Sequence, residues 1–170
     1  MKQNQQIFSI DKLISEARRL AADYRRATGK SLGISAEIAR HDACVLLNLE
    51  PVDDAAIGYD AVGRGAREGE RVQIKGRAIF DETKRGQRVG QLKLEQEWDK
   101  VVLVIMDNEF QADTIYEASR TEILAAMDRQ ADSKRSKRGA ISVARFKNIG
   151  RQVWNRDEGL IQDEIWDNRA

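Results

Sequence analysis

The sequence predicts an α+β fold in which a mixed β-sheet of about five strands is flanked by helices, as in an α/β sandwich. Residues 10–28 and 35–49 carry apolar side chains at the spacing of amphipathic helices. Residues 101–106, VVLVIM, form a short β-branched run, which is typical of a strand buried on both faces. Residues 70–80 alternate between apolar and polar side chains, as a half-exposed strand does. Helices followed by strands and a last helix indicate the α+β class.

Both N-terminal helices have start and stop signals. Ser9 can accept a hydrogen bond from a free amide at the start of the first helix, and Gly29 can adopt the left-handed conformation that ends it. Ser35 is the expected cap of the second helix, and Pro51 prevents its continuation beyond about residue 49. We therefore expect two helices before the first strand.

Two short strands are expected at about 56–62 and 70–80. Gly63, Gly65 and Gly69 lie between them, and glycine gives a connection the conformational freedom that a tight turn needs. The two strands therefore form a predicted hairpin.

Three further segments complete the predicted sheet and its last helix. A strand covers about 89–95, and residues 110–118 are expected to pair antiparallel with residues 101–106. The sequence SRTE at 119–122 is a capping box, which opens a helix that runs to about Met127.

Composition bounds the domain organisation. The chain has 170 residues, of which 41% are hydrophobic and 34% charged, and this suits one domain with a heavily solvated surface. We expect residues 1–133 to form the core domain, including the N-terminal helix. Residues 134–170 are expected to form a basic, helical C-terminal extension packed on that core, with a short helix near residues 143–153.

Charge is distributed unevenly along the chain, although the formal net charge is only +1. Residues 134–156 hold eight basic residues and no acidic residue, so the rest of the chain is net acidic. A basic segment of this kind is typical of a phosphate-binding face. The eight residues are Lys134, Arg135, Lys137, Arg138, Arg145, Lys147, Arg151 and Arg156.

Cysteine usage and hydropathy indicate a cytoplasmic protein. Cys44 is the only cysteine, so no disulfide can form within the chain, which favours a reducing compartment. No apolar run approaches the length of a membrane span, and the N-terminus lacks the apolar core of a signal peptide. We expect no membrane partner.

Several common catalytic and binding motifs are missing. The sequence has no P-loop, no GxGxxG motif and no plausible Ser-His-Asp set, and its single histidine makes histidine acid–base catalysis improbable. Glu37, His41 and Cys44 share one stripe of the second helix, but no second histidine or cysteine completes a zinc site. His41 is expected to pair with Glu37 on the helix surface.

The most informative stretch is residues 59–77, YDAVGRGAREGERVQIKGR. Twelve residues separate Asp60 from Gln73, and one residue separates Gln73 from Lys75. Gln73 and Lys75 point to the same side of a strand, and a hairpin would bring Asp60 beside them. A carboxylate, an amide oxygen and an ammonium group together suit a hard metal ion and a phosphate.

This arrangement resembles the PD-(D/E)xK nuclease superfamily, which has the restriction-endonuclease-like fold. The wider string GYDAV…VQIKGR is similar to an uncharacterised bacterial branch of small restriction-like proteins, over about Ala36 to Ala125. Gln73 departs from the family pattern, because the usual residue at this position is glutamate or aspartate. The resemblance implies a metal-dependent endonuclease that hydrolyses DNA with Mg²⁺ or Mn²⁺, in restriction or defence.

The resemblance also implies a role for each site residue. Asp60, the Gln73 amide oxygen and the Ile74 backbone carbonyl would hold the metal ion, and Lys75 would orient the attacking water or stabilise the transition state. Glu37 would reach the metal from its helix, although an acid near a helix N-terminus is also favoured by the helix dipole alone. Separately, Arg77 lies on the same strand face as Lys75 and could contact a neighbouring phosphate.

Other interpretations stay open at this point. A solvated edge strand would show the same alternation at Gln73 and Lys75. A catalytically inactive nucleic-acid-binding module on the same fold would depend instead on Arg145, Lys147 and Arg151. The chain could also act as a homodimer, or as a subunit of a restriction or defence complex.

Overall fold

The computed structural model describes residues 9–53, 57–81, 83, 86–128 and 140–161. Its main sheet has seven strands in the order β1-β2-β3-β5-β6-β8-β9, and β4 pairs with β7 in a separate two-stranded sheet. Only β3 and β5 pair in parallel among the described strands. The strands are β1 (Leu49–Pro51), β2 (Ala61–Gly63), β3 (Arg71–Ala78), β4 (Arg88–Gln91), β5 (Lys100–Met106), β6 (Ala112–Ser119), β7 (Ala140–Ser142), β8 (Arg151–Asn155) and β9 (Gly159–Leu160).

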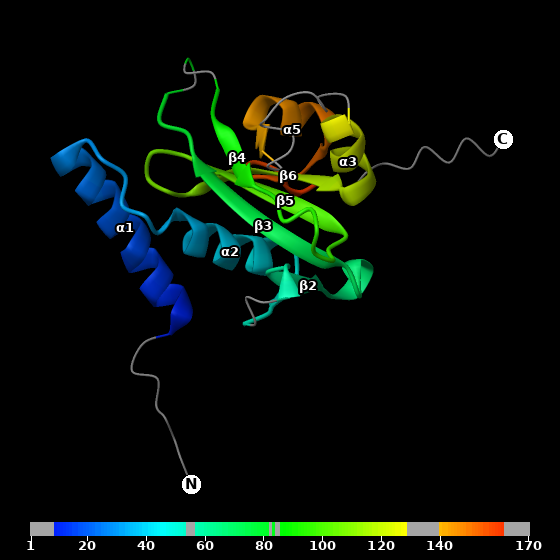
Figure 1. The fold of residues 1–170 in the computed structure, drawn as a ribbon. Coiled ribbons are helices and arrows are strands. Elements are labelled where there is room, and N and C mark those ends of the chain that lie inside the picture. Colours follow the sequence, from blue (N-terminus) through cyan, green and yellow to red (C-terminus); the bar gives the residue numbers. More distant parts are fainter. Residues whose placement is uncertain (1–8, 54–56, 82, 84–85, 129–139, 162–170) are drawn as a thin grey trace, which may run out of the picture.

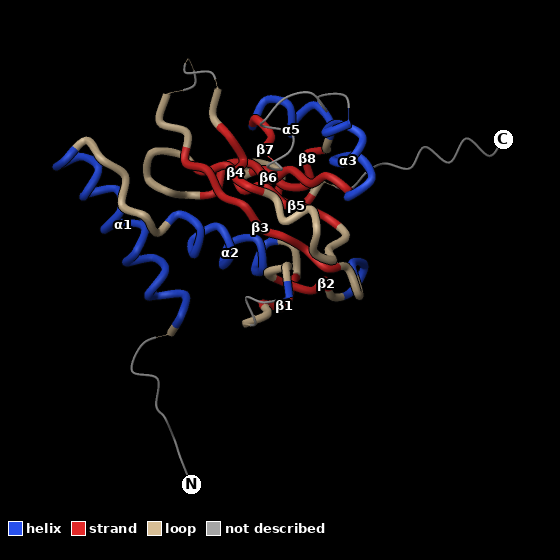
Figure 2. Tube along the Cα trace, in the orientation of Figure 1, coloured by secondary structure: helices blue, strands red, loops and turns tan. Residues whose placement is uncertain are grey.

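Helices cover both faces of the main sheet (Figures 1 and 2). The helix α2 packs on one face and α1 lies beyond it, whereas α3 and α5 lie on the other face with β4 and β7. The helices are α1 (Ile10–Thr28), α2 (Ser35–Leu46), α3 (Arg120–Asp128) and α5 (Val143–Ile149), and a 3₁₀ turn covers Gly65–Arg67. The predicted α+β class is therefore confirmed, but the sheet is larger than the five strands expected.

The central strand β5 divides the core into two parts. Val102, Val104 and Met106 face the core beneath α2, and the alternate residues of β5 face the core beneath α3 and α5. Each of its residues from 101 to 106 is buried. The VVLVIM run was predicted to be buried on both faces, and this prediction is confirmed.

Local signals set the ends of α1 and α3 as predicted. The Ser9 side chain accepts a hydrogen bond from the backbone amide of Lys12, and Gly29 ends α1 with φ = 70°. At the start of α3, Ser119 and Glu122 form both hydrogen bonds of a capping box, at 2.7 and 3.2 Å. These contacts join residues three positions apart, which is why the sequence alone predicts them.

Three other boundaries differ from prediction. The cap of the second helix is Ile34 rather than Ser35, and no described side chain caps this end by a hydrogen bond. The second helix ends at Leu46 rather than near residue 49, because Asn48 adopts a left-handed φ of 56° and Leu49–Pro51 pairs with β2 as strand β1. The strand expected at 56–62 begins only at Ala61, and residues 54–56 lie outside the described chain.

The C-terminal extension contributes more strand than the sequence predicts. The helix expected near 143–153 ends at Ile149, and the chain continues as β8, which pairs antiparallel with β6. Of the strand expected at 89–95, only the part up to Gln91 forms, and this strand, β4, pairs with β7 in the small sheet. The part of residues 134–170 that the structure describes is therefore integrated into both sheets, with α5 as its helix.

None of the described helices is both long and apolar enough to cross a membrane.

Candidate functional site

A pocket of about 460 Å³ lies beside β3, between the N-terminal part of α2 and strand β4. It brings together Asp60, Gln73, Ile74, Lys75 and Arg77, as the sequence predicts. The other lining residues are Ala36, Gly58, Gly76, Val89, Gly90, Gln91 and Lys93. Gly76 allows α2 to approach β3 this closely, because a Cβ at position 76 would clash with Ala39.

Asp60 caps the open edge of β3. The strand β2 pairs with β3 only at Arg71 and Val72, so the next outward-facing amide, that of Ile74, has no strand partner. The Asp60 carboxylate accepts this amide's hydrogen bond at 2.7 Å, and the Asp60 amide donates to the Val72 carbonyl at 2.8 Å. The N–H and C=O of one strand residue point to the same edge, so the Ile74 carbonyl also faces Asp60.

Gln73 is the unusual residue of the pocket. Its side chain is only 2% exposed, and neither its amide nitrogen nor its amide oxygen has a hydrogen-bond partner among the described residues. Leaving a buried amide unpaired costs about 1 to 3 kcal/mol. Burial contradicts the alternative that Gln73 simply lies on a solvated strand face. An unpaired amide that lines a pocket is instead available to a ligand.

Lys75 is half-buried and forms no ion pair with another described residue. Burial lowers the pKa of its ammonium group, the Asp60 carboxylate opposes this shift, and the charges of Lys93 and Arg77 add to it. Lys75 therefore lies in a partly desolvated site, where the interaction of its ammonium group with an anion is stronger than in water.

Arg77 has a structural role beside the pocket. Its guanidinium group donates to the backbone carbonyls of Arg88 and Gly76, and burial lowers its pKa. Gly90, with φ = 102°, leaves room for it, because a Cβ there would lie 2.8 Å from the guanidinium nitrogen. These contacts hold β4 against β3. A contact between Arg77 and a phosphate remains a prediction.

The structure does not bring Glu37 into the pocket. Glu37 is exposed in the first turn of α2, and the neighbouring Ala36 lines the pocket instead. The predicted pairing of His41 with Glu37 is wrong, because His41 contacts Asp11 of α1 at 3.0 Å. The dipole of α2 accounts for the position of Glu37 without a metal ion.

The basic residues of the C-terminal segment lie outside the pocket. Arg145 donates to the Ala126 carbonyl at 3.1 Å, and Lys147 lies 5.3 Å from the ring centre of Tyr116. Arg151 pairs with Glu117 at 2.7 Å. Lys134, Arg135, Lys137 and Arg138 fall outside the described residues. Arg145 and Arg151 thus hold parts of the fold together, and their binding of nucleic acid remains a prediction.

Sequence reasoning missed the residues that the β4 side contributes, chiefly Gln91 and Lys93. Their distance in sequence from Lys75 is not fixed by any strand or helix period. No local signal therefore identifies them, and only the packing of β4 beside β3 brings them to the pocket.

The oxygen donors of the pocket suit a hard divalent cation better than zinc. Asp60 offers a carboxylate, Gln73 an unpaired amide oxygen and Ile74 a backbone carbonyl, and Mg²⁺ and Mn²⁺ prefer such oxygen ligands. Among the residues that the structure describes, no group of three or more His, Cys, Asp or Glu side chains gathers as a metal site. Burial raises the pKa of Cys44 to about 11, so its thiol stays protonated.

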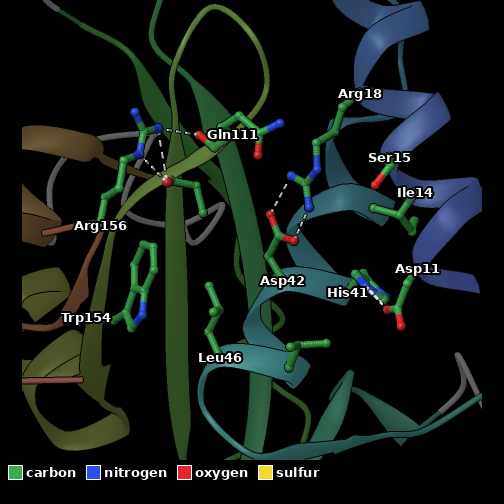
Figure 3. A pocket seen from close by; sticks show the side chains of 12 residues that line it. Asp11, Ile14, Ser15, Arg18, His41, Asp42, Leu46, Gln111, Trp154 and Arg156 are labelled. Carbon is green, nitrogen blue, oxygen red and sulfur yellow. Dashed lines mark hydrogen bonds and ion pairs between the residues drawn. The ribbon is translucent and has the colours of Figure 1, made fainter. Parts of the chain in front are cut away.

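A larger cavity of about 620 Å³ lies between α1, α2 and the β6–β8 region (Figure 3). Its charged side chains are already paired. Arg18 binds the Asp42 carboxylate with both guanidinium nitrogens and also donates to the Phe110 carbonyl, and Arg156 pairs with Asp107. The Arg18–Asp42 pair fastens α1 to α2, and the Arg156–Asp107 pair joins the residue after β8 to the residue after β5. This cavity therefore offers less unmet hydrogen-bonding capacity than the β3 pocket.

No protein-family model matches the sequence, and a search of curated proteins finds no match.

Proposed function

We propose that the protein is a metal-dependent nuclease that hydrolyses phosphodiester bonds, with DNA as the expected substrate. One observation carries the proposal. The buried amide of Gln73 has no hydrogen-bond partner within the described part of the chain, and it lines the same pocket as the Asp60 carboxylate and the Lys75 ammonium group. An unpaired buried amide does not stabilise the fold. A bound metal ion would give the amide oxygen of Gln73 a partner.

In this proposal Asp60, the Gln73 amide oxygen and the Ile74 carbonyl hold Mg²⁺ or Mn²⁺. Such an ion, when bound, polarises the scissile phosphate and lowers the pKa of a nearby water molecule. The Ile74 amide fixes the Asp60 carboxylate through the 2.7 Å hydrogen bond, which leaves the other carboxylate oxygen for the ion. Lys75 stabilises the negative charge that develops on the phosphate in the transition state.

A second function, a catalytically inactive nucleic-acid-binding module, is favoured by one observation. Asp60 is the only carboxylate among the described residues that line the pocket, and a site with fewer charged ligands binds a divalent cation more weakly. If cleavage has been lost, the same cationic pocket still attracts phosphates, and the basic residues of the C-terminal segment would add to that attraction.

The test is a cleavage assay on plasmid and linear DNA with Mg²⁺ or Mn²⁺, with Lys75→Ala beside the wild type. We expect metal-dependent cutting by the wild type and a loss of about 100-fold or more in rate for the variant. Lys30→Ala, which removes an exposed lysine between α1 and α2, is the control and should cut normally.

Cutting that persists in Lys75→Ala would place the chemistry elsewhere. No cutting by either protein, with salt-dependent binding of DNA retained, would favour the binding module. We further propose a cytoplasmic role in restriction or defence, as a homodimer or as a subunit of a larger complex. Sedimentation of the purified protein, alone and with DNA, tests the homodimer.

A further inference from the structure

We infer that Lys93 is a second phosphate-binding residue of the β3 pocket and that the pocket grips the nucleic-acid backbone without reading bases. This inference rests on the proposed function and adds a residue that neither the sequence motif nor its resemblance indicates. It is carried by the position of Lys93, by the anchoring of its backbone and by the charge of the pocket.

Lys93 approaches the pocket from the segment that follows β4, whereas Lys75 approaches it from β3. The Lys93 side chain is exposed and forms no ion pair with another described residue. The two lysines are close enough for the charge of one to act on the other. An anion between them would relieve this repulsion.

The backbone that carries Lys93 is fixed by buried contacts. Its carbonyl accepts a hydrogen bond of 2.7 Å from the indole of Trp98, a side chain that is only 1% exposed. Arg120 donates to the carbonyls of Leu94 and Gln96 at 2.6 and 2.8 Å, and its guanidinium group lies 4.6 Å from the Trp98 ring centre. A lysine on so rigid a segment loses little backbone entropy when it binds a phosphate.

The excess of positive charge in the pocket favours the binding of an anion. In the part of the chain that the structure describes, the lining has three cationic side chains, Lys75, Arg77 and Lys93, and one carboxylate, Asp60. Among the described residues that line the pocket, none is aromatic and could stack on a base, and Gln91 is the only polar side chain besides Asp60, Gln73 and the three cations. The chemistry of the lining therefore fits the sugar–phosphate backbone, which is the same in every sequence.

The experiment measures duplex binding by fluorescence anisotropy in EDTA over a range of salt concentrations, so that neither metal nor turnover enters. We expect Lys93→Gln to weaken binding equally for two unrelated DNA sequences and to reduce the slope of log K against log salt by about 1. Arg19→Gln removes the same charge from an exposed residue of α1 outside the pocket and should leave the slope unchanged.

A cleavage measurement separates this inference from the proposed function. In an active protein, Lys93→Gln should raise KM about tenfold with kcat nearly unchanged, because a phosphate contact contributes to binding rather than to the chemical step. Cleavage with an unaltered slope and KM in Lys93→Gln would overturn the role of Lys93 and leave the nuclease standing. A reduced slope without any cleavage would support Lys93 and count against the nuclease. A wild-type protein that binds no DNA would overturn both.

Discussion

Gln73 and Glu117 are two buried polar side chains on the strands that flank β5, and their surroundings are opposite in kind. Gln73 of β3 is 2% exposed and Glu117 of β6 is 3% exposed. They lie on opposite faces of the sheet, because Gln73 is in register with Val101 and Glu117 with Val102. The two residues are thus buried to nearly the same extent, and they differ in their hydrogen-bond and ion-pair partners.

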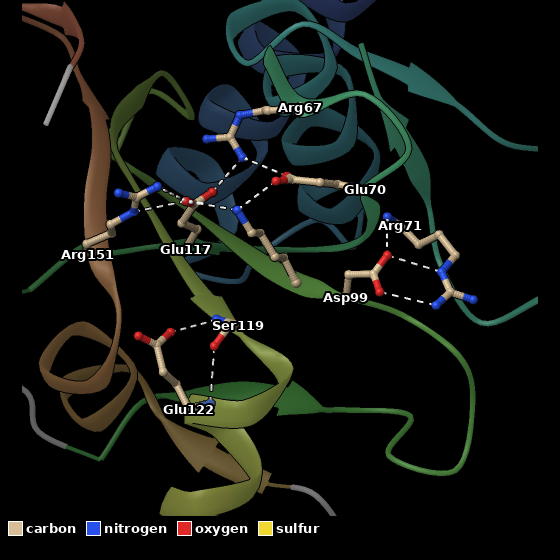
Figure 4. Close-up of polar contacts among 9 residues, drawn as sticks. Arg67, Glu70, Arg71, Asp99, Glu117, Ser119, Glu122 and Arg151 are labelled. Atoms are coloured by element: carbon tan, nitrogen blue, oxygen red, sulfur yellow. Dashed lines mark hydrogen bonds and ion pairs between the residues drawn. The ribbon is translucent and has the colours of Figure 1, made fainter. Parts of the chain in front are cut away.

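Glu117 is surrounded by cations (Figure 4). Its carboxylate pairs with Arg67 at 2.6 Å, with Arg151 at 2.7 Å and with Lys100 at 3.6 Å. Burial by itself would raise the pKa of Glu117, but the hydrogen bonds from Arg151 and Arg67 reverse the effect and hold the pKa below 4.5. This cluster joins β6 to β8 and to the turn before β3.

Gln73 has no partner at all among the described residues. The comparison sets a buried polar group that is fully paired beside one that is not. A paired group such as Glu117 stabilises the protein as it stands, whereas an unpaired group such as Gln73 lowers its stability until something binds. Four predictions test this comparison and the pocket around Gln73.

The largest effect is expected for Glu117→Gln. This change removes an anion that Arg67, Arg151 and Lys100 share, while Glu70 still pairs with Arg67 at 3.3 Å and with Lys100 at 2.8 Å. Breaking a buried pair of this kind lowers the free energy of unfolding by about 3 to 5 kcal/mol. Urea denaturation at pH 7 measures it. Glu109→Gln, which removes the exposed partner of Arg26, is the control and should barely change stability.

The same comparison has a pH dependence. Glu117 has a lowered pKa in the folded state, so its contribution is complete above its unfolded value of 4.5 and is lost as the pH falls through the folded value. The difference between wild type and Glu117→Gln should therefore shrink below about pH 4.5. A difference that stays constant down to pH 3 would mean that charge pairing is not its cause.

A smaller effect of opposite sign is expected for Gln73→Met. The replacement keeps the shape of the side chain and removes the unpaired amide, so the free energy of unfolding should rise by about 1 to 2 kcal/mol. Cleavage should fall in the same variant. Gln152→Met is the matched control, because the Gln152 amide bonds to Tyr116 and Asn155 and its loss should destabilise the protein. Destabilisation of both variants to the same degree would remove the distinction between the two glutamines.

The smallest effect is expected for the pKa of Lys75. The NMR signal of the Lys75 side chain, recorded as a function of pH, measures this pKa. Asp60→Asn should lower this pKa further, and Lys93→Gln should raise it, because the two charges act on Lys75 in opposite directions. Folded Lys75 loses its proton at a lower pH than unfolded Lys75. Protonated Lys75 therefore lowers the free energy of unfolding at neutral pH, and this destabilisation disappears as the pH rises through the two pKa values. Shifts in the same direction for both variants would contradict the arrangement of the pocket.

Much of the site was predictable because its spacing is local. The alternation of β3 places Gln73 and Lys75 on one face, and the short connection after Asp60 returns the chain to them. The sequence did not reveal that Gln73 would be buried rather than solvated. That outcome depends on β4, α3 and α5, which cover this face of the sheet from more distant parts of the chain.

The sequence by itself determined the features that rest on neighbouring residues. These are the two ends of α1, the capping box of α3, the doubly buried strand β5 and the grouping of Asp60 with Gln73 and Lys75. Hydrogen bonds and side-chain periods over a few residues fix each of them.

The tertiary structure alone decided the rest. It made Leu49–Pro51 and Arg151–Asn155 strands, because β2 and β6 offer edges for them to pair with. It also turned Arg151 toward Glu117, moved Glu37 out of the pocket and brought Lys93 into it. Such outcomes depend on contacts between residues far apart in the chain, and the periodicity of one segment carries no information about them.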